Sequence, residues 1–199
     1  MKRFVTLLLA LMMLMSLAAC GEGGLSLKPG GNNDDLILPD DDGVAVGYAG
    51  DTLRTAFFDM TVENPQTCTE FDGLVPDPGY KFLTADITLY NYTDYSQPMF
   101  DDDFTILWEV GSGDDATLDG DWPVYEEIMD ESGNTSYTTK SDKQMPTQFS
   151  LGIHQTRTEL LLFQVPEDVQ DFYVVFEEVY DDGTEEGSYG DIFYVRFSA

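Results

Sequence analysis

The sequence is poor in the residues that most catalytic and metal centres use. Its 199 residues include one histidine, His154, and two cysteines, Cys20 and Cys68. A zinc centre needs more His or Cys ligands than this, and the one available Cys–His dyad is Cys68 with His154. No Gly-x-Ser-x-Gly nucleophile motif occurs. The sequence therefore predicts a protein that is not an enzyme and that needs no cofactor.

Basic residues are also scarce. There are 9 Lys and Arg against 38 Asp and Glu, which gives a formal charge of −29. Nucleic-acid binding depends on a basic surface that displaces counterions from phosphate, so this class of function is excluded. Hydrophobic residues make up 42 % and aromatic residues 13 % of the chain, enough for a packed core and too much for a disordered acidic tail. We expect one globular domain.

The chain has one long apolar run, and it lies at the N-terminus. Phe4–Leu17 follows Lys2 and Arg3 and has 14 residues, whereas a membrane-spanning helix needs about 20. Leu-Ala-Ala-Cys follows, ending at Cys20, and this sequence resembles the lipobox of bacterial lipoproteins. The resemblance implies that residues 1–19 are a signal peptide and that Cys20 is acylated, which anchors the protein on the extracellular face of the membrane. An ordinary secretory signal with a chance cysteine is the alternative.

Residues 20–43 are rich in Gly, Asn, Asp and Pro and predict a flexible tether. Within it, Leu36-Ile37-Leu38 is apolar enough to dock as a short edge segment. If Cys20 carries the lipid, Cys68 is the only thiol left and no intrachain disulfide can form. We interpret Cys68 as a half-buried loop residue, and the alternative is an exposed thiol that pairs with another molecule.

Residues 44–199 show the period-two pattern of β-strands. In Tyr80–Tyr90 the apolar residues alternate with polar ones, with Leu83, Ala85, Ile87 and Leu89 on one face. No convincing amphipathic helix is present, and the nearest candidate is Val124–Met129. The expected fold is all-β, an immunoglobulin-like antiparallel β-sandwich preceded by the signal peptide and the flexible linker. Further strands are expected at Leu53–Glu63, Phe104–Glu109, Thr147–His154, Glu159–Val165, Phe172–Val179 and Ile192–Phe197.

Several short motifs in this region carry a resemblance. They are Gly50-Asp51-Thr52, Met60-Thr61-Val62, Tyr80–Asn91, Asp103-Phe104-Thr105-Ile106 and Leu161–Pro166. In this order they resemble a family of Gram-positive bacterial lipoproteins with an immunoglobulin-like domain of unknown function (DUF4352-like). The resemblance implies a sandwich at the cell surface and brings no catalytic residues. The acidic loops and the long segment Gly111–Gly133 depart from the family pattern.

One acidic segment has the spacing of a calcium-binding loop. Asp115, Thr117, Asp119, Asp121 and Glu126 match the Asp-x-Asp-x-Asp-Gly-x5-Glu pattern except for the threonine. Oxygens at alternate positions can converge on Ca²⁺, but Trp-Pro stands where the loop should enter a helix. A turn at Asp119-Gly120 with a solvated acidic face is the competing interpretation. The other acidic runs, Asp101–Asp103 among them, are expected to stay solvated.

Exposed aromatic residues offer the second candidate site. Trp108 alternates with Phe104 and Ile106 and is expected in the core, whereas Trp122 lies in a polar loop. Tyr92 and Tyr95 follow the strand at Tyr80–Tyr90 in another polar loop. Exposed Tyr and Trp rings can stack against sugars, so Tyr92, Tyr95 and Trp122 form a candidate ligand platform.

These observations favour a lipid-anchored, non-catalytic binding module with a protein or glycan partner at the cell envelope. The alternative from another class is a secreted hydrolase that uses loop carboxylates. A purely structural domain that pairs a sheet edge with a partner strand is the third. A pocket with convergent carboxylates would favour the enzyme, and a surface with exposed aromatic rings would favour the binding module.

Overall fold

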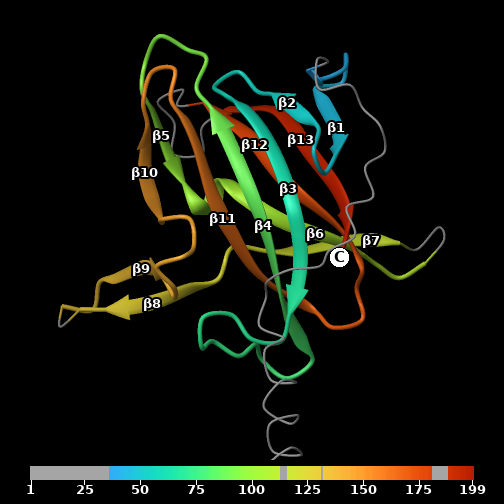
Figure 1. Cartoon of the computed structure of the whole chain (residues 1–199), viewed down its shortest axis with the longest axis vertical. Helices are drawn as coiled ribbons and strands as arrows, with labels where there is room; N and C mark the ends of the chain where they lie inside the picture. The colour runs from blue at the N-terminus through green and yellow to red at the C-terminus, as the bar shows by residue number, and fades with distance from the viewer. Residues whose placement is uncertain (1–35, 113–115, 131, 181–187) are drawn as a thin grey trace, which may run out of the picture.

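The computed structural model describes residues 36–112, 116–130, 132–180 and 188–199, and these fold as a β-sandwich (Figure 1). Residues 1–35, which include the predicted signal peptide and Cys20, lie outside the described residues. The strands are β1 (Val44–Tyr48), β2 (Thr52–Arg54), β3 (Asp59–Cys68), β4 (Tyr80–Tyr90), β5 (Gln97–Phe100), β6 (Phe104–Val110), β7 (Thr117–Asp121), β8 (Tyr125–Met129), β9 (Thr135–Thr139), β10 (Gln148–Leu151), β11 (Thr156–Pro166), β12 (Asp171–Tyr180) and β13 (Ser188–Ser198).

Two sheets form the layers of the sandwich. One has the strand order β1-β13-β12-β6-β7 and the other β11-β4-β3-β2. The central pairs are antiparallel, and β1 runs parallel to β13. Strands β4 and β11 pair in one sheet. The chain passes from β4 through β5 to β6 and from β11 directly to β12, and β6 and β12 pair in the other sheet. This Greek-key connection is typical of immunoglobulin-like folds and confirms the predicted fold class.

The core fills the space between the two sheets. Its members come from both inner faces, and the aromatic ones pack closely: the Phe58 and Phe176 ring centroids are 4.9 Å apart. Trp108 is buried with Phe104 and Ile106, as the alternation predicted. On β4 the four predicted inward residues are all buried. Thr84, expected on a wet face, is buried too, because a smaller cluster around Phe82 and Leu162 covers the outer side of this sheet.

One predicted strand is divided in the structure, and one segment that was considered for a helix is extended. The strand expected at Leu53–Glu63 is divided between β2 and β3 by a turn in which the Thr55 hydroxyl accepts hydrogen bonds from the Phe57 and Phe58 amides, both 3.0 Å. Val124–Met129, the nearest helix candidate in a sequence expected to contain no convincing helix, is not helical. Its last five residues are β8, which pairs antiparallel with β9 from Tyr125 opposite Thr139 to Met129 opposite Thr135.

Part of the predicted tether contacts the sandwich. Ile37 forms a parallel bridge with Leu53, and its amide donates to the Thr52 carbonyl at 2.9 Å. Ile37 also packs against the main core, which confirms that the apolar tripeptide docks at a sheet edge. Asp40 then forms a turn in which its side chain accepts from the amide of Val44 at 3.1 Å. Contacts with the sandwich therefore begin before residue 44, the predicted start of the folded domain.

Cys68, the last residue of β3, is disulfide-bonded. The prediction that Cys68 remains a thiol is wrong for this structure. An oxidising location such as the outer cell surface favours such a bond. No helix among the described residues is long and apolar enough to cross a membrane.

Candidate functional site

A surface pocket lies between the β5–β10 pair and the β8–β9 hairpin. Its volume is about 390 Å³, within the range of small-molecule sites. In Figure 1 the β8–β9 hairpin projects from the sandwich below β10, so the pocket is at the base of this projection. The residues that line it come from four separate segments: Phe100, Asp101, Asp102, Trp122, Pro123, Tyr125, Tyr137, Thr147 and Gln148.

The hairpin is held over the sandwich by the residues that lead into it. The Val124 amide donates to the Leu162 carbonyl at 2.8 Å, and the Val124 carbonyl accepts from Gln144 Nε2 at 2.7 Å. Pro123 is buried, and Val124 packs against the outer cluster on β4 and β11. These contacts fix the direction in which the chain passes from β7 to β8. They therefore position Trp122, which precedes the fixed residues Pro123 and Val124, and Tyr125, which follows them.

Aromatic rings form most of the pocket wall. Trp122 is 57 % exposed and Tyr137 56 %, and Phe100 and Tyr125 are also exposed. Tyr125 and Tyr137 are diagonal neighbours across the hairpin, and their rings meet edge to face with centroids 4.9 Å apart. Large apolar rings are rarely left in water without a function when they gather around one cavity.

The acidic side of the pocket is a short 3-10 turn, Asp101–Asp103. Burial raises the pKa of Asp101, and the neighbouring Asp102 carboxylate raises it further. Burial also raises the pKa of Asp103 to about 6, although its carboxylate accepts a hydrogen bond from the Phe100 amide at 2.9 Å. The prediction that this run stays solvated is wrong for Asp101, which is 7 % exposed. None of the ion pairs within the described residues involves these three carboxylates.

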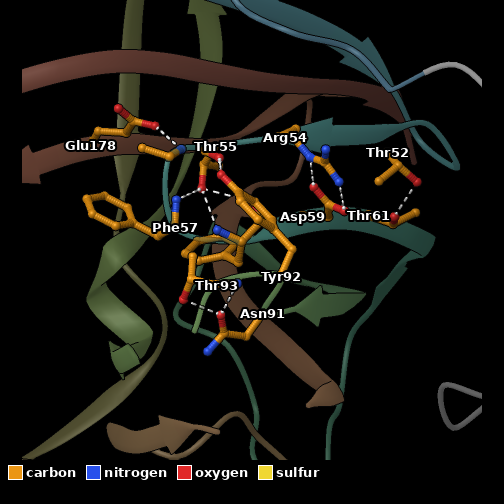
Figure 2. A network of polar contacts seen from close by, with 12 residues as sticks. Thr52, Arg54, Thr55, Phe57, Asp59, Thr61, Asn91, Tyr92, Thr93 and Glu178 are labelled. Atoms are coloured by element: carbon orange, nitrogen blue, oxygen red, sulfur yellow. Dashed lines mark hydrogen bonds and ion pairs between the residues drawn. The ribbon is translucent and has the colours of Figure 1, made fainter. Parts of the chain in front are cut away.

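The predicted aromatic platform is only partly present. Trp122 is exposed as expected and lies in the pocket, but neither Tyr92 nor Tyr95 lines it. Tyr95 is exposed in the loop after β4. Tyr92 is half-buried, because its hydroxyl donates to the Thr55 carbonyl at 2.6 Å and its ring lies 4.5 Å from the Arg54 guanidinium carbon (Figure 2). Tyr92 is therefore a packed residue, and its predicted exposure is wrong.

The polar network around Tyr92 is structural. Arg54 makes a two-pronged contact with Asp59, at 2.7 and 2.9 Å. The buried Glu178 of β12 accepts from the Ala56 amide at 2.6 Å, which joins the two sheets (Figure 2). Glu178 also accepts from the Tyr180 hydroxyl at 2.5 Å, a contact that raises the pKa of Tyr180 to about 12. Every buried polar side-chain atom of the described residues has a partner, so this network has no vacant position for a ligand.

The structure does not bring the described residues of the predicted calcium loop together around one point. Thr117, Asp119 and Asp121 lie on β7 and Glu126 on β8, while Asp115 lies outside the described residues. Thr117 and Asp121 are four residues apart on this strand, about 13 Å, so the predicted ligands cannot all converge on one ion. Within the described part of the chain, no group of three His, Cys, Asp or Glu side chains could hold a metal.

Gly120 has a different role from the predicted turn. It lies within β7 opposite Leu107 of β6, and a Cβ atom here would be 2.6 Å from the Ile106 carbonyl oxygen. The glycine allows close contact between the two backbones.

Cys68 and His154 are not brought together. Cys68 pairs with Phe82 near one end of β4, whereas the Gln155 carbonyl next to His154 accepts from the Asn91 amide just past the other end. Tyr90 is eight residues after Phe82 on this strand, so the two positions are about 26 Å apart. His154 lies in an exposed turn, and its Nε2 atom is 3.7 Å from Asp94 Oδ1. This geometry excludes the dyad.

Neither a protein-family model nor a curated protein sequence matches the chain. Three of the solved structures that the chain matches come from Bacillus subtilis and Clostridium difficile. YcdA of Bacillus subtilis, named as a candidate lipoprotein, is 9 % identical with a TM-score of 0.46; the match covers 74 % of this chain and 38 % of YcdA. YjhA of B. subtilis is 11 % identical with a TM-score of 0.45, over 75 % of this chain and 99 % of YjhA. An uncharacterised β-sandwich protein of Clostridium difficile is 11 % identical with a TM-score of 0.39, over 77 % and 93 % of the two chains.

Proposed function

We propose that this protein is a lipid-anchored, non-catalytic binding module on the extracellular face of a bacterial membrane, and that the pocket beneath the β8–β9 hairpin is its ligand site. The observation that carries the proposal is the set of four exposed aromatic rings around one cavity. Rings in this arrangement bury apolar ligand surface with little loss of side-chain entropy, which suits recognition.

The acids of the pocket fit binding better than hydrolysis. Glycoside hydrolysis needs two carboxyl groups that flank the scissile bond from opposite sides. Asp101 and Asp102, the two that line the pocket, are adjacent in one 3-10 turn and approach a ligand from the same side. A hydrolase with loop carboxylates is therefore the less favoured alternative.

The ligand site is tested by capture of envelope material. The purified wild-type domain is immobilised and incubated with solubilised cell-wall and membrane fractions, in parallel with Trp122→Ala and Tyr95→Ala. Both substitutions remove one exposed ring, but only Trp122 belongs to the pocket. We expect Trp122→Ala to lose the captured material and Tyr95→Ala to retain it. Equal capture by all three proteins, or hydrolysis of the bound material, would contradict the proposal.

The anchor is tested separately on whole cells. A palmitate analogue should label the wild-type protein and not Cys20→Ser, and the variant should appear in the medium. The sequence has only two cysteines, so the proposed anchored form is one in which the Cys20 thiol carries the lipid and the Cys68 disulfide of this structure is not made within the chain. An unlabelled protein whose peptide map contains a Cys20–Cys68 crosslink would overturn the anchor.

A further inference from the structure

The pocket combines aromatic faces with carboxylates and contains no basic side chain. Four of its residues are aromatic and two are aspartates, and neither Lys nor Arg nor His is among them. A neutral ligand needs no such charge, and an anionic ligand would be repelled by it. The face of an aromatic ring carries partial negative charge, so both kinds of side chain attract a cation.

We propose that the pocket binds an organic cation, an ammonium group substituted with small alkyl groups. This inference rests on the proposed function and names the ligand class of the same site. Tyr125 and Tyr137 meet at an interplanar angle of 82°, so they present two walls at a right angle rather than a single stacking plane. Such walls surround a tetrahedral ammonium group better than they cover a flat sugar ring.

Burial makes a cation more favourable here than at an ordinary acidic surface. Asp101 is almost fully buried, and its turn has no cationic partner among the ion pairs of the described residues. A carboxylate that is partly removed from water without a counter-charge is destabilised. A bound ammonium group would supply that counter-charge, and the rings around it would exclude water from the contact.

The electrostatic field of the whole protein also favours a cationic ligand. A formal charge of −29 on 199 residues concentrates cations near the surface and raises their association rate. This long-range effect is not specific, because every exposed carboxylate contributes to it. The local effect of the pocket must therefore be separated from it by experiment.

The test compares two probes of the same shape. Choline and 3,3-dimethylbutan-1-ol differ only in that a quaternary nitrogen replaces a quaternary carbon, so their affinities for the purified protein, measured by calorimetry and by the shift of Tyr and Trp side-chain NMR signals, isolate the charge. We expect choline to bind at least tenfold more tightly than the alcohol. We also expect the signals of Trp122, Tyr125 and Tyr137 to shift.

Two pairs of variants locate the site. Trp122→Ala should weaken choline binding at least fivefold, whereas Tyr95→Ala should leave it unchanged. Asp102→Asn should weaken it at least threefold, whereas Asp94→Asn should have little effect. Asp94 is also exposed and outside the pocket, so both Asp variants change the net charge equally.

The outcomes distinguish this inference from the function on which it rests. Equal affinity for the two probes, or equal effects of Asp102→Asn and Asp94→Asn on choline binding, overturns the proposal that the ligand is a cation. So does an absence of choline binding at 50 mM. If neutral N-acetylglucosamine oligomers bind the wild type and not Trp122→Ala, the ligand class is wrong and the binding function stands. If the capture of envelope material is also unchanged by Trp122→Ala, the proposed ligand class and the proposed binding site are both wrong.

Discussion

The hydroxyl of Tyr92 donates a 2.6 Å hydrogen bond to the carbonyl of Thr55, which joins the loop after β4 to the turn between β2 and β3. Thr55 is 2 % exposed, so this carbonyl has no access to bulk water. Tyr92 was a candidate ligand residue from the sequence because an aromatic residue in a polar loop is usually exposed. The hydrogen bond explains why this one is not.

Tyr92→Phe should lower the free energy of unfolding by about 1 kcal/mol, because the Thr55 carbonyl loses its donor while the ring remains next to Arg54. Urea denaturation measures the change. Tyr95→Phe is the matched control, and we expect less than about 0.5 kcal/mol for it because Tyr95 is exposed. Unchanged stability of Tyr92→Phe combined with loss of ligand capture would instead restore Tyr92 as a binding residue.

Gly120→Ala should destabilise the protein by about 1–3 kcal/mol, since the added Cβ would lie 2.3 Å from Leu107 Cδ2 and 2.6 Å from the Ile106 carbonyl oxygen. Because Trp122 follows β7 directly, displacement of this strand should also weaken choline binding. Gly133→Ala is the comparison. Gly133 has a φ of +83° but open space around it, so only backbone strain of about 1 kcal/mol is expected. A cost for Gly120→Ala no larger than that for Gly133→Ala would show that β7 can move away from β6 freely.

The sandwich could be predicted from the sequence because the period of two is strong where one strand face is buried. Tyr80–Tyr90 was predicted with the bounds of β4, since its alternate apolar residues all point into one core. The strands β1, β5, β7, β8 and β9 were missed. β1 and β5 have only five and four residues, too few for an alternation to stand out. β7, β8 and β9 are exposed along most of their length, so no apolar alternation marks them.

The pocket was mostly hidden from the sequence for a related reason. Trp122 was found because a tryptophan in a polar loop is conspicuous. Tyr125 lies three residues after Trp122, but Phe100 and Tyr137 come from two other segments, and the strand pairings of β5 with β10 and of β8 with β9 bring them to the same cavity. Aromatic residues in separate segments give no local signal of a shared cavity. The one available hint was the pair of tyrosines on either side of the turn at Gly133, which a hairpin brings onto one face.

The acidic turn at the pocket should make stability depend on pH. The pKa of Asp103 is raised to about 6 in the folded protein, whereas an unfolded Asp has a pKa near 3.8. Between these values the folded state binds the proton and the unfolded state does not, so this group's contribution to stability is fully present below about pH 3.8 and is lost as the pH rises through 6. Asp103→Asn cannot ionise, and its amide oxygen can still accept from the Phe100 amide. We expect the melting temperature of the variant to be higher than that of the wild type at pH 7 and equal to it near pH 4.

The measurement is thermal unfolding of both proteins at pH 4, 5, 6 and 7. A difference between the two proteins that is constant over this range would show that Asp103 does not titrate there.

The excess of negative charge predicts that salt stabilises the fold. Removal of residues 1–19 would take away two basic residues and no acidic one, so the formal charge would change from −29 to −31. Mutual repulsion among these carboxylates is greatest in the compact state, and it is screened as the Debye length falls from about 30 Å at 0.01 M salt to about 3 Å at 1 M. We expect the melting temperature at pH 7 to rise by several degrees over this range of NaCl. A flat profile would contradict the prediction.

Divalent cations extend the same experiment to the acidic strand β7. CaCl₂ and MgCl₂ at equal ionic strength should raise the melting temperature by the same amount, because the described residues contain no preformed group of ligands for either ion. Thr117, Asp119 and Asp121 are spread along a strand, and the carboxylates of Asp119 and Asp121 each accept from the next backbone amide. A larger rise with Ca²⁺ at submillimolar concentration, abolished by Asp119→Asn and unaffected by Asp142→Asn, would show that this segment leaves its strand to form the loop that its sequence resembles.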